Sequence, residues 1–419
     1  MRSYSEGVFL RKTHKASIGL SLVGVIVEYF DYALYGFLAT EITAHFFPHH
    51  SIKNGLHNTF AIFAMGSVAK PFGNIVFARI GDHKGRAQVI RIGLWGLLIS
   101  TLGLGLIPSY DTWGIWSLIG LIICRFIQGA VIGGQTDGIR LLITEHIGPR
   151  LKHFSHGIMV ASSSIGIFMA AYAAGRMHHF PHLHWQDLYL MGASLCFVLV
   201  ILRHWIVDSS IFVNAKKKMQ THISTRDLFW KNKALFLIVV FVMGTNGGIY
   251  HFFAIFLNSY TTDLMQIFTQ EEGAQISTLV SMGYAIGGLL LGGIIDVFNR
   301  DRISWIIFIG LILCCLSLCY VLVTHTFSSL LFFGLGFFLS GSSMPILVTI
   351  ISHLPVRNRY RFLGFSHVMG SLIFSGTTPL ISTRLFHLNW YLPIVWLYVL
   401  LFLYVGSTYA LFKQKKRMD

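Results

Sequence analysis

Two carboxylates three residues apart, Glu28 and Asp31, stand inside a long apolar run, residues 16–40. A charged side chain at membrane depth is costly, so each is a functional candidate by default. At this spacing the two share one face of a helix, and such a pair suits a proton carrier. Either they couple proton or substrate movement, or one pairs with a buried cation to hold helices together. Asp31 is the better proton-coupling candidate because it lies deeper in the run.

Cationic and amide side chains occur in the next apolar runs and are candidates for substrate binding. Lys70, before Pro71, either holds an anionic substrate, pairs with Asp31, or extends to the membrane interface. Arg125, Gln128 and Gln135 form a stripe on one helix face, a suitable polar wall for a cavity. Arginine offers two parallel hydrogen bonds to a carboxylate, although a structural ion pair explains it equally well.

Further candidates for substrate contact lie in apolar runs of both halves of the chain. They are Tyr32, Asn246, Tyr250, His251 and His367. For each histidine the alternative is a packing residue with a satisfied hydrogen bond. Asp137 and Arg140, three residues apart, are expected to pair with each other or with loop partners rather than with substrate. Gly129, with three further glycines nearby, predicts close helix packing.

These side chains must be positioned by membrane helices. Hydrophobic residues make up 54% of the 419 residues and charged residues only 12%, and a helix spans a bilayer with about 20 apolar residues. Twelve such runs are predicted, which makes the chain an all-α integral membrane protein in contact with the lipid bilayer. They are residues 16–40, 57–79, 88–107, 114–140, 154–175, 187–206, 234–258, 275–297, 303–323, 327–351, 362–383 and 391–412.

The net charge of +15 follows topology and does not indicate a nucleic-acid partner. Lysine and arginine concentrate at the N-terminus, at the tail and in every second connection, which predicts that both termini are cytoplasmic. The longest such connection, residues 207–233, separates two predicted halves, residues 1–206 and 234–419. A cleaved signal peptide is not expected, because the first apolar run is too long.

A polar turn recurs once in each half. The first copy contains Gly81, Asp82, Gly85 and Arg86, and a degenerate copy about half the chain later contains Asp296 and Arg300. Duplication of a turn between membrane helices indicates a transporter built from two six-helix pseudo-repeats. We expect these six residues to form a cytoplasmic gate, with Gly85 allowing a left-handed backbone.

The turn resembles the signature of the major facilitator superfamily, with Ala78 at its first glycine. Four further segments resemble the metabolite:proton symporter branch, whose members transport proline/betaine, α-ketoglutarate, citrate and shikimate. They are VEYFDYALYGF at 27–37, AKPFG at 69–73, RFIQGAVIGG at 125–134 and FSGTTPLI at 374–381. One departure is that Gln135 stands where the branch has a glutamate. Asp137 is on roughly the opposite helix face and cannot simply replace it.

The resemblance implies a proton-coupled importer of a small polar metabolite in a bacterial inner membrane: an organic acid, amino acid or zwitterionic osmolyte. Alternatives are an exporter of a polycarboxylate siderophore or drug, and a membrane sensor that transports nothing. No phosphate-binding loop or nucleophile elbow occurs, so an enzyme is not expected, nor is a cofactor. We expect protons and a small molecule as partners of a monomer.

Two histidine-rich segments, HFFPHH at 45–50 and HHFPHLH at 178–184, are predicted on the outer side. We interpret them as polar loop ends near lipid headgroups and expect no bound metal. The alternatives are a metal site, which needs three or four converging ligands, and a pH sensor, since imidazole titrates near neutral pH.

Overall fold

The computed structural model describes residues 2–147, 149–177, 179–180, 182–208, 225–298, 300–352 and 359–416. The side chains at 2–14, 82, 83, 149, 225, 226, 300, 301, 352, 415 and 416 lie outside that description. Within the described ranges the chain is helical throughout and contains no strand, as the apolar runs predict. Part of the expected connection, residues 209–224, and the histidine at 178 fall outside them.

The first half crosses the membrane with six helices. They are α1 (Arg2–Phe37), α3 (Ile52–Lys84), α4 (Arg86–Leu106), α6 (Ile115–Ile147), α7 (Lys152–Met177) and α8 (Trp185–Leu202). Short elements lie at their ends: α2 (Ala39–Phe46), α5 (Tyr110–Trp113), η1 (Pro149–Leu151) and η2 (Arg203–Trp205). A further short helix, α10 (Thr225–Lys231), precedes the second half.

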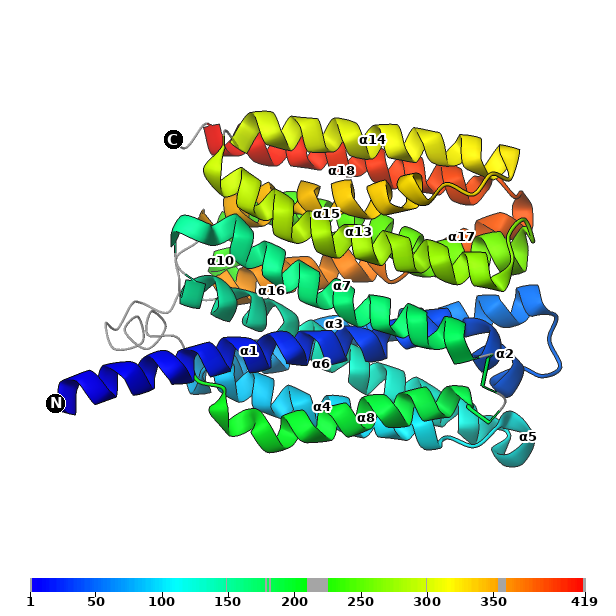
Figure 1. The fold of residues 1–419 in the computed structure, drawn as a ribbon, viewed down its shortest axis with the longest axis horizontal. Coiled ribbons are helices and arrows are strands. Elements are labelled where there is room, and N and C mark those ends of the chain that lie inside the picture. Colours follow the sequence, from blue (N-terminus) through cyan, green and yellow to red (C-terminus); the bar gives the residue numbers. More distant parts are fainter. Residues whose placement is uncertain are drawn as a thin grey trace.

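The second half repeats this plan with α13 (Gln270–Val297), α14 (Arg300–Thr324), α15 (Ser329–Ser352) and α18 (Leu392–Lys416). Its other two crossings contain π-helical turns. One is α11 (Lys233–His251), η3 (Phe252–Phe256), α12 (Leu257–Ser259) and η4 (Tyr260–Leu264) in succession; the other is α16 (Arg359–Gly370), η5 (Ser371–Ser375) and α17 (Thr378–Leu388). In Figure 1 the helices of the two halves form two adjoining groups, with α7 beside α13 where they meet.

Eleven helices in the described ranges are long and apolar enough to span a bilayer. The predicted run 362–383 is not one continuous span, because its helix is interrupted between η5 and α17. Pro379 has no N–H to donate to the Ser375 carbonyl one turn earlier. His251 supplies the missing donor, with its Nδ1 2.7 Å from that carbonyl oxygen. This eleventh crossing along the chain is therefore a broken helix whose freed backbone group is satisfied by another helix.

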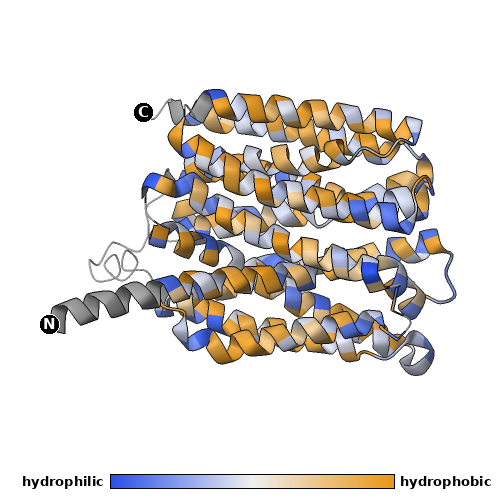
Figure 2. Cartoon of the chain, in the orientation of Figure 1, coloured by the Kyte–Doolittle hydropathy of each residue, from blue (hydrophilic) through white to orange (hydrophobic). Residues whose placement is uncertain are grey.

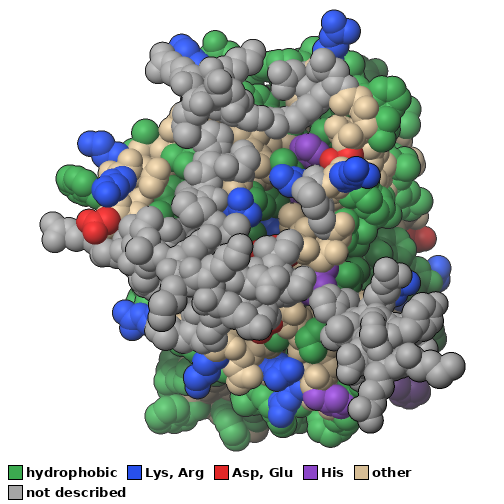
Figure 3. All heavy atoms as spheres, turned by 90° about the vertical axis from the view of Figure 1, so that its left-hand side faces the viewer, with side chains coloured by type: hydrophobic (Ala, Val, Ile, Leu, Met, Phe, Trp, Pro, Cys, Tyr) green, Lys and Arg blue, Asp and Glu red, His purple; other side chains and the backbone are tan. Residues whose placement is uncertain are grey.

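The helix α1 begins, and α18 ends, at the same end of the bundle (Figure 1). Apolar residues cover most of the helix lengths, and polar residues concentrate toward the helix ends and the interior (Figure 2). Lysine and arginine side chains appear over the end where the termini lie (Figure 3). This distribution agrees with the charge pattern from which a cytoplasmic location of that end is predicted.

We expect reporter fusions at Pro48 and at Lys217, which lies outside the described residues, to report opposite sides of the membrane. Pro48 follows α2 at the end of the bundle away from the termini, whereas Lys217 belongs to the basic connection. Paired alkaline phosphatase and fluorescent-protein fusions measure this. Signals from the same side at both positions would contradict the predicted topology.

Close backbone contact between α3 and α6 fixes how these two helices face each other. A Cβ atom at Gly129 would collide with the backbone of Gly66, and one at Gly73 with the backbone of Ala130. Small residues at such positions let membrane helices pack backbone against backbone. The glycines therefore set the rotation of α6, and with it the direction in which its polar side chains point.

The substitution Gly129→Ala is expected to destabilise the protein by about 1–3 kcal/mol, because the added methyl group meets rigid backbone. Gly24→Ala is the matched control, since a Cβ there meets nothing within 4 Å. Thermal unfolding of the purified variants in detergent measures the difference. Equal transition temperatures for the two variants would show that the α3–α6 contact is not this tight.

Candidate functional site

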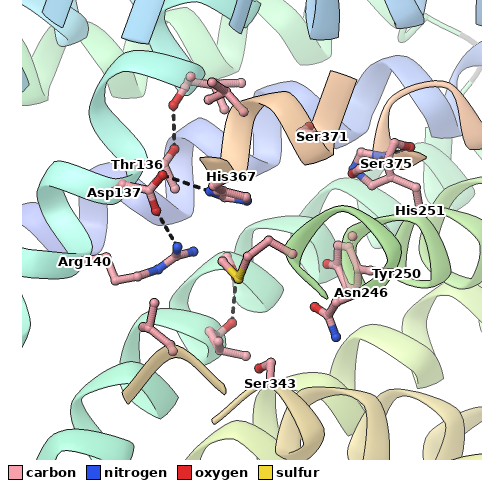
Figure 4. A pocket seen from close by; sticks show the side chains of 18 of the residues that line it. Thr136, Asp137, Arg140, Asn246, Tyr250, His251, Ser343, His367, Ser371 and Ser375 are labelled. Atoms are coloured by element: carbon pink, nitrogen blue, oxygen red, sulfur yellow. Dashed lines mark hydrogen bonds and ion pairs between the residues drawn. The ribbon is translucent and has the colours of Figure 1, made fainter. Parts of the chain in front are cut away.

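A cavity of about 130 Å³ lies between the two halves, walled by α1, α3, α6 and α7 of the first and by α11, α13, α15, α16 and η5 of the second (Figure 4). Six of the nine predicted substrate-binding residues line it: Tyr32, Lys70, Asn246, Tyr250, His251 and His367. The other three, Arg125, Gln128 and Gln135, do not. The lining also includes side chains that the sequence analysis did not assign to substrate: Thr136, Asp137, Arg140, His156 and Tyr284.

Lys70 is buried in this cavity, with only 7% of its surface exposed. Its Nζ donates to Ser371 Oγ across the two halves at 2.8 Å and lies 5.1 Å from the centre of the Tyr32 ring. The lysine therefore does not extend to the membrane interface. Among the described residues no carboxylate oxygen lies within 4.0 Å of it, so it is an ammonium group available to an anion.

Arg125 lies behind the cavity wall, fully buried among the rings of Tyr32, Tyr35 and Phe63. Its Nη1 donates to the Gln128 amide oxygen, and the Gln128 amide nitrogen donates to Asp31. Nε and Nη2 of Arg125 and Oδ1 of Asp31 have no hydrogen-bond partner in the described part of the chain. Gln128 thus connects a buried cation to a buried anion, and unused polar atoms remain at both ends.

The second carboxylate, Glu28, has an amide partner as well. It accepts hydrogen bonds from Gln135 Nε2 and, at 2.8 Å, from Thr136 Oγ1. Gln135 faces α1 at this point, whereas Asp137 faces the cavity, as their two-residue spacing predicts. Since Thr136 lines the cavity, one hydroxyl group separates Glu28 from it.

Asp137 and Arg140 form the expected ion pair, which is confirmed. Asp137 also bonds the Nδ1 of His367 in the second half, at 2.9 Å (Figure 4). Their place in the cavity lining was not anticipated, because the sequence shows their spacing but not the direction they face. Nδ1 of His156, from α7, is buried beside them without a hydrogen-bond partner among the described residues.

The polar side chains of α11 differ in their freedom to bind a ligand. The His251 Nδ1 is engaged by the Ser375 carbonyl, which fits the alternative that this histidine serves packing. The amide nitrogen of Asn246 and the hydroxyl of Tyr250 have no hydrogen-bond partner in the described ranges. Both residues line the cavity (Figure 4), where an unpaired buried donor favours a hydrogen-bonding ligand.

In the part of the histidine-rich segments that the structure describes, no three candidate metal ligands converge. His45 packs against the ring of Trp185, with ring centres 5.1 Å apart. Burial lowers the pKa of His45, so the imidazole is neutral at neutral pH. His184 caps α8, its backbone N–H bonded to Asp187 at 2.8 Å. These contacts fit loop ends rather than ligands.

The first copy of the repeated turn lies at the end of the bundle where the termini lie (Figure 1). Gly85 has a φ of +103°, which confirms the predicted left-handed backbone. Arg86 pairs with Glu145 within the first half, and Gly81 lies against the ring of Tyr360 in the second. The side chains of Asp82 and Arg300 lie outside the described residues, so their gating role stays a prediction.

Asp296, from the second copy, joins the halves. Its carboxylate accepts from the Nδ1 of His153 at 2.6 Å and from the backbone N–H groups of His153 and Phe154 at 3.2 and 2.9 Å. It thereby caps α7 from α13. Nearby, the Tyr360 hydroxyl donates to the Gly134 carbonyl, again between halves. At the opposite end, Thr40 bonds Asp263 at 3.2 Å, so the halves touch on both sides of the cavity.

We expect Asp296→Ala to weaken closure at the end where the termini lie, because three bonds between the halves are lost. In a background whose five native cysteines are replaced by serine, a cysteine at Ser163, in the cavity wall, should react with a maleimide at least about tenfold faster in this variant, since a hydrogen bond to a charged group contributes about 1.5–3 kcal/mol. The control is Asp187→Ala, which removes a cap within one half. Equal labelling rates would contradict a gate at Asp296.

Comparison with known proteins agrees with this fold. The sequence model of the Major Facilitator Superfamily matches residues 21–378. An inner membrane metabolite transport protein of Escherichia coli is 26% identical over 90% of this chain and 89% of its own length. The proline/betaine transporter of the same organism is 24% identical over 89% of this chain and 78% of its own length. A solved D-xylose-proton symporter superposes with a TM-score of 0.69 at 13% identity, over 93% of this chain and 97% of its own. The crystal structure of a human organic anion transporter superposes with a TM-score of 0.70 at 13% sequence identity. The match covers 95% of this chain and 99% of that structure's chain.

Proposed function

The chain belongs to the Major Facilitator Superfamily, and we propose that this transporter imports a small polar metabolite together with protons across a bacterial inner membrane. Its family and its relatives are transporters rather than enzymes. The observation that carries the proposal is the juxtaposition of Lys70, which has no carboxylate partner among the described residues, with the buried carboxylates of Asp31 and Glu28. Asp31 is hydrogen-bonded to Gln128, and Glu28 to Thr136, which lines the cavity.

The proton site is the relay of Asp31, Gln128 and Arg125. A glutamine side chain has both donor and acceptor atoms. The Gln128 amide nitrogen donates to Oδ2 of the ionised Asp31, and a proton on Oδ1, which has no partner among the described residues, leaves that hydrogen bond in place. Asp31 therefore keeps a partner in either protonation state. Glu28 has the same kind of partner in Gln135 and shares this role.

The cavity supports a small substrate. Pockets for drug-sized ligands usually measure about 300–1,000 Å³, and this one is about 130 Å³. That size favours a metabolite over the siderophore or drug of the export alternative. The named relatives include a proline/betaine transporter, and Lys70 can hold the carboxylate of an organic acid, an amino acid or a zwitterionic osmolyte.

Alternating access follows from the contacts on both sides of the cavity. Asp296 and Tyr360 join the halves at one end, and Thr40 with Asp263 joins them at the other. A substrate reaches the cavity only when one set separates. Protonation and substrate binding then act by changing the relative stability of two arrangements of the halves, one closed at each end of the cavity.

Accumulation driven by a pH gradient tests the proposal. Purified protein in liposomes, acidic outside, is given labelled organic acids, amino acids and betaine. Uptake above equilibration that a protonophore abolishes supports proton-coupled import. Accumulation only when the interior is acidic would instead indicate export by exchange, and equilibration unaffected by the protonophore would indicate a facilitator.

A further inference from the structure

We propose that the substrate is a small hydroxylated monocarboxylate that moves with one proton, so that the transport cycle carries no net charge. This inference rests on the proposed proton symport and deepens it, since it specifies the charge class of the substrate. It follows from three features of the site: the donors available to a carboxylate, the charges already neutralised, and the unpaired polar atoms of the wall.

The carboxylate position is at Lys70 and Ser371. The Ser371 hydroxyl accepts a hydrogen bond from Lys70 Nζ at 2.8 Å, and its own proton has no acceptor among the described residues. An ammonium group and a hydroxyl donor thus lie side by side, one from each half of the protein. A carboxylate with two oxygens can accept from both. Binding there joins the two halves, as an occluded substrate must.

Every other charge at the cavity already has a partner. Arg140 pairs with Asp137, which also bonds His367. The remaining titratable groups in the wall, from α1, α7, α11 and α13, are Tyr29, Tyr32, His156, Tyr250, His251 and Tyr284. Among the described residues that line the cavity, Asp137 is the only carboxylate, so the ammonium of a zwitterion finds no free anion there, while Lys70 and Arg140 both repel it.

The buried charges in and behind the first half's wall sum to zero when all are ionised. The anions are Glu28, Asp31 and Asp137, and the cations are Lys70, Arg125 and Arg140. A buried net charge is costly in the low-dielectric interior. One proton on Asp31 or Glu28 brings the group to +1, and one monoanion at Lys70 restores neutrality. A zwitterion leaves +1, and a dicarboxylate leaves −1.

The body of the substrate meets hydrogen-bonding groups. The amide nitrogen of Asn246 and the hydroxyl of Tyr250 are unpaired in the described part of the chain, and Ser343 lines the same cavity (Figure 4). Hydroxyl groups on the substrate satisfy the Asn246 and Tyr250 atoms, whereas a simple alkyl chain leaves both buried without partners. This selects a hydroxy acid over a fatty acid of the same size.

Liposomes in which the pH gradient and the membrane potential are set independently test the inference. The probes are labelled glycerate and lactate, succinate, and glycine betaine with proline. We expect an acidic exterior to drive glycerate uptake, and a potassium diffusion potential to change its initial rate by less than twofold. Succinate and the two zwitterions should accumulate at least tenfold less.

Other outcomes distinguish failure of the monocarboxylate inference from failure of the proposed proton symport. Uptake of betaine, proline or succinate that responds to both the pH gradient and the membrane potential would overturn the monocarboxylate inference and leave proton symport standing. So would glycerate uptake that a negative interior accelerates severalfold. If no probe responds to the pH gradient, both the inference and the proposed function fail.

Binding to Lys70 variants supplies a second readout that does not need transport. Lys70→Gln should weaken glycerate binding to the detergent-solubilised protein by about 10- to 100-fold, measured by calorimetry, and Ser371→Ala by a smaller factor. Lys53→Gln, in the exposed first turn of α3, is the control and should bind as wild type does. If Lys70→Gln does not fold, the glycerate affinities of Lys70→Arg and Ser371→Ala test the assignment instead. Unchanged affinity in Ser371→Ala and in every folded Lys70 variant would overturn the assignment.

Discussion

Replacing Asp31 by asparagine is expected to abolish uphill accumulation while leaving exchange of substrate down its own gradient. A gradient of one pH unit corresponds to about 1.4 kcal/mol per proton, which supports about tenfold accumulation at one proton per substrate. Asparagine has nearly the same shape and still pairs with Gln128 but cannot exchange a proton. The accumulation ratio should therefore fall from about ten to about one, whereas counterflow exchange should persist.

The matched control for this substitution is Asp111→Asn, an exposed aspartate in the short helix α5. It should accumulate substrate as wild type does. If Asp31→Asn still concentrates substrate against a gradient, Asp31 is not the proton carrier. The same assay on Glu28→Gln then asks whether the second buried carboxylate, held by Gln135 and Thr136, carries the proton instead.

Loss of Arg125 is expected to have the largest effect on stability. Its guanidinium is fully buried, and among the described residues its hydrogen-bonded link to Asp31 runs through Gln128. Arg125→Leu leaves that carboxylate as an uncompensated buried charge, which costs about 3–5 kcal/mol. We expect a loss of folded protein in the membrane and a clear drop in the thermal unfolding temperature in detergent.

A double substitution distinguishes charge imbalance from lost packing. Combined Arg125→Leu and Asp31→Asn removes both charges, so much of the stability should return while accumulation remains absent. Arg176→Leu, at the far end of α7, removes a cation outside this relay and should cost little. If the double variant is as unstable as Arg125→Leu alone, the arginine acts through packing against Tyr32, Tyr35 and Phe63 rather than through Asp31.

The sequence located many of the polar residues at the site because each interrupts an apolar run. A charged or amide side chain in a membrane helix is rare enough to be noticed without any structure. The same argument identified Lys70 and His367, whereas Asp137 and Arg140 were predicted from their spacing as an ion pair and not as part of the cavity wall. The helical character and the repeated turn followed from composition and from spacing in the same way.

The directions of these side chains were not predictable, because they depend on contacts between helices. The stripe of Arg125, Gln128 and Gln135 was expected to wall the cavity, but it faces α1 and its neighbours. Close packing of Gly129 on Gly66 sets that rotation. Likewise, His251 bonds the carbonyl that Pro379 frees, a relationship between residues more than a hundred positions apart.

Counting protons against substrate molecules tests the central claim most directly. Purified protein in liposomes without an initial pH gradient or potential is given an inward gradient of a transported substrate, and external pH is recorded alongside labelled uptake. Coupled transport predicts alkalinisation of the medium in step with uptake, at about one proton per substrate, and none in Asp31→Asn. Uptake by the wild-type protein with no change in external pH would contradict proton symport and leave a facilitator.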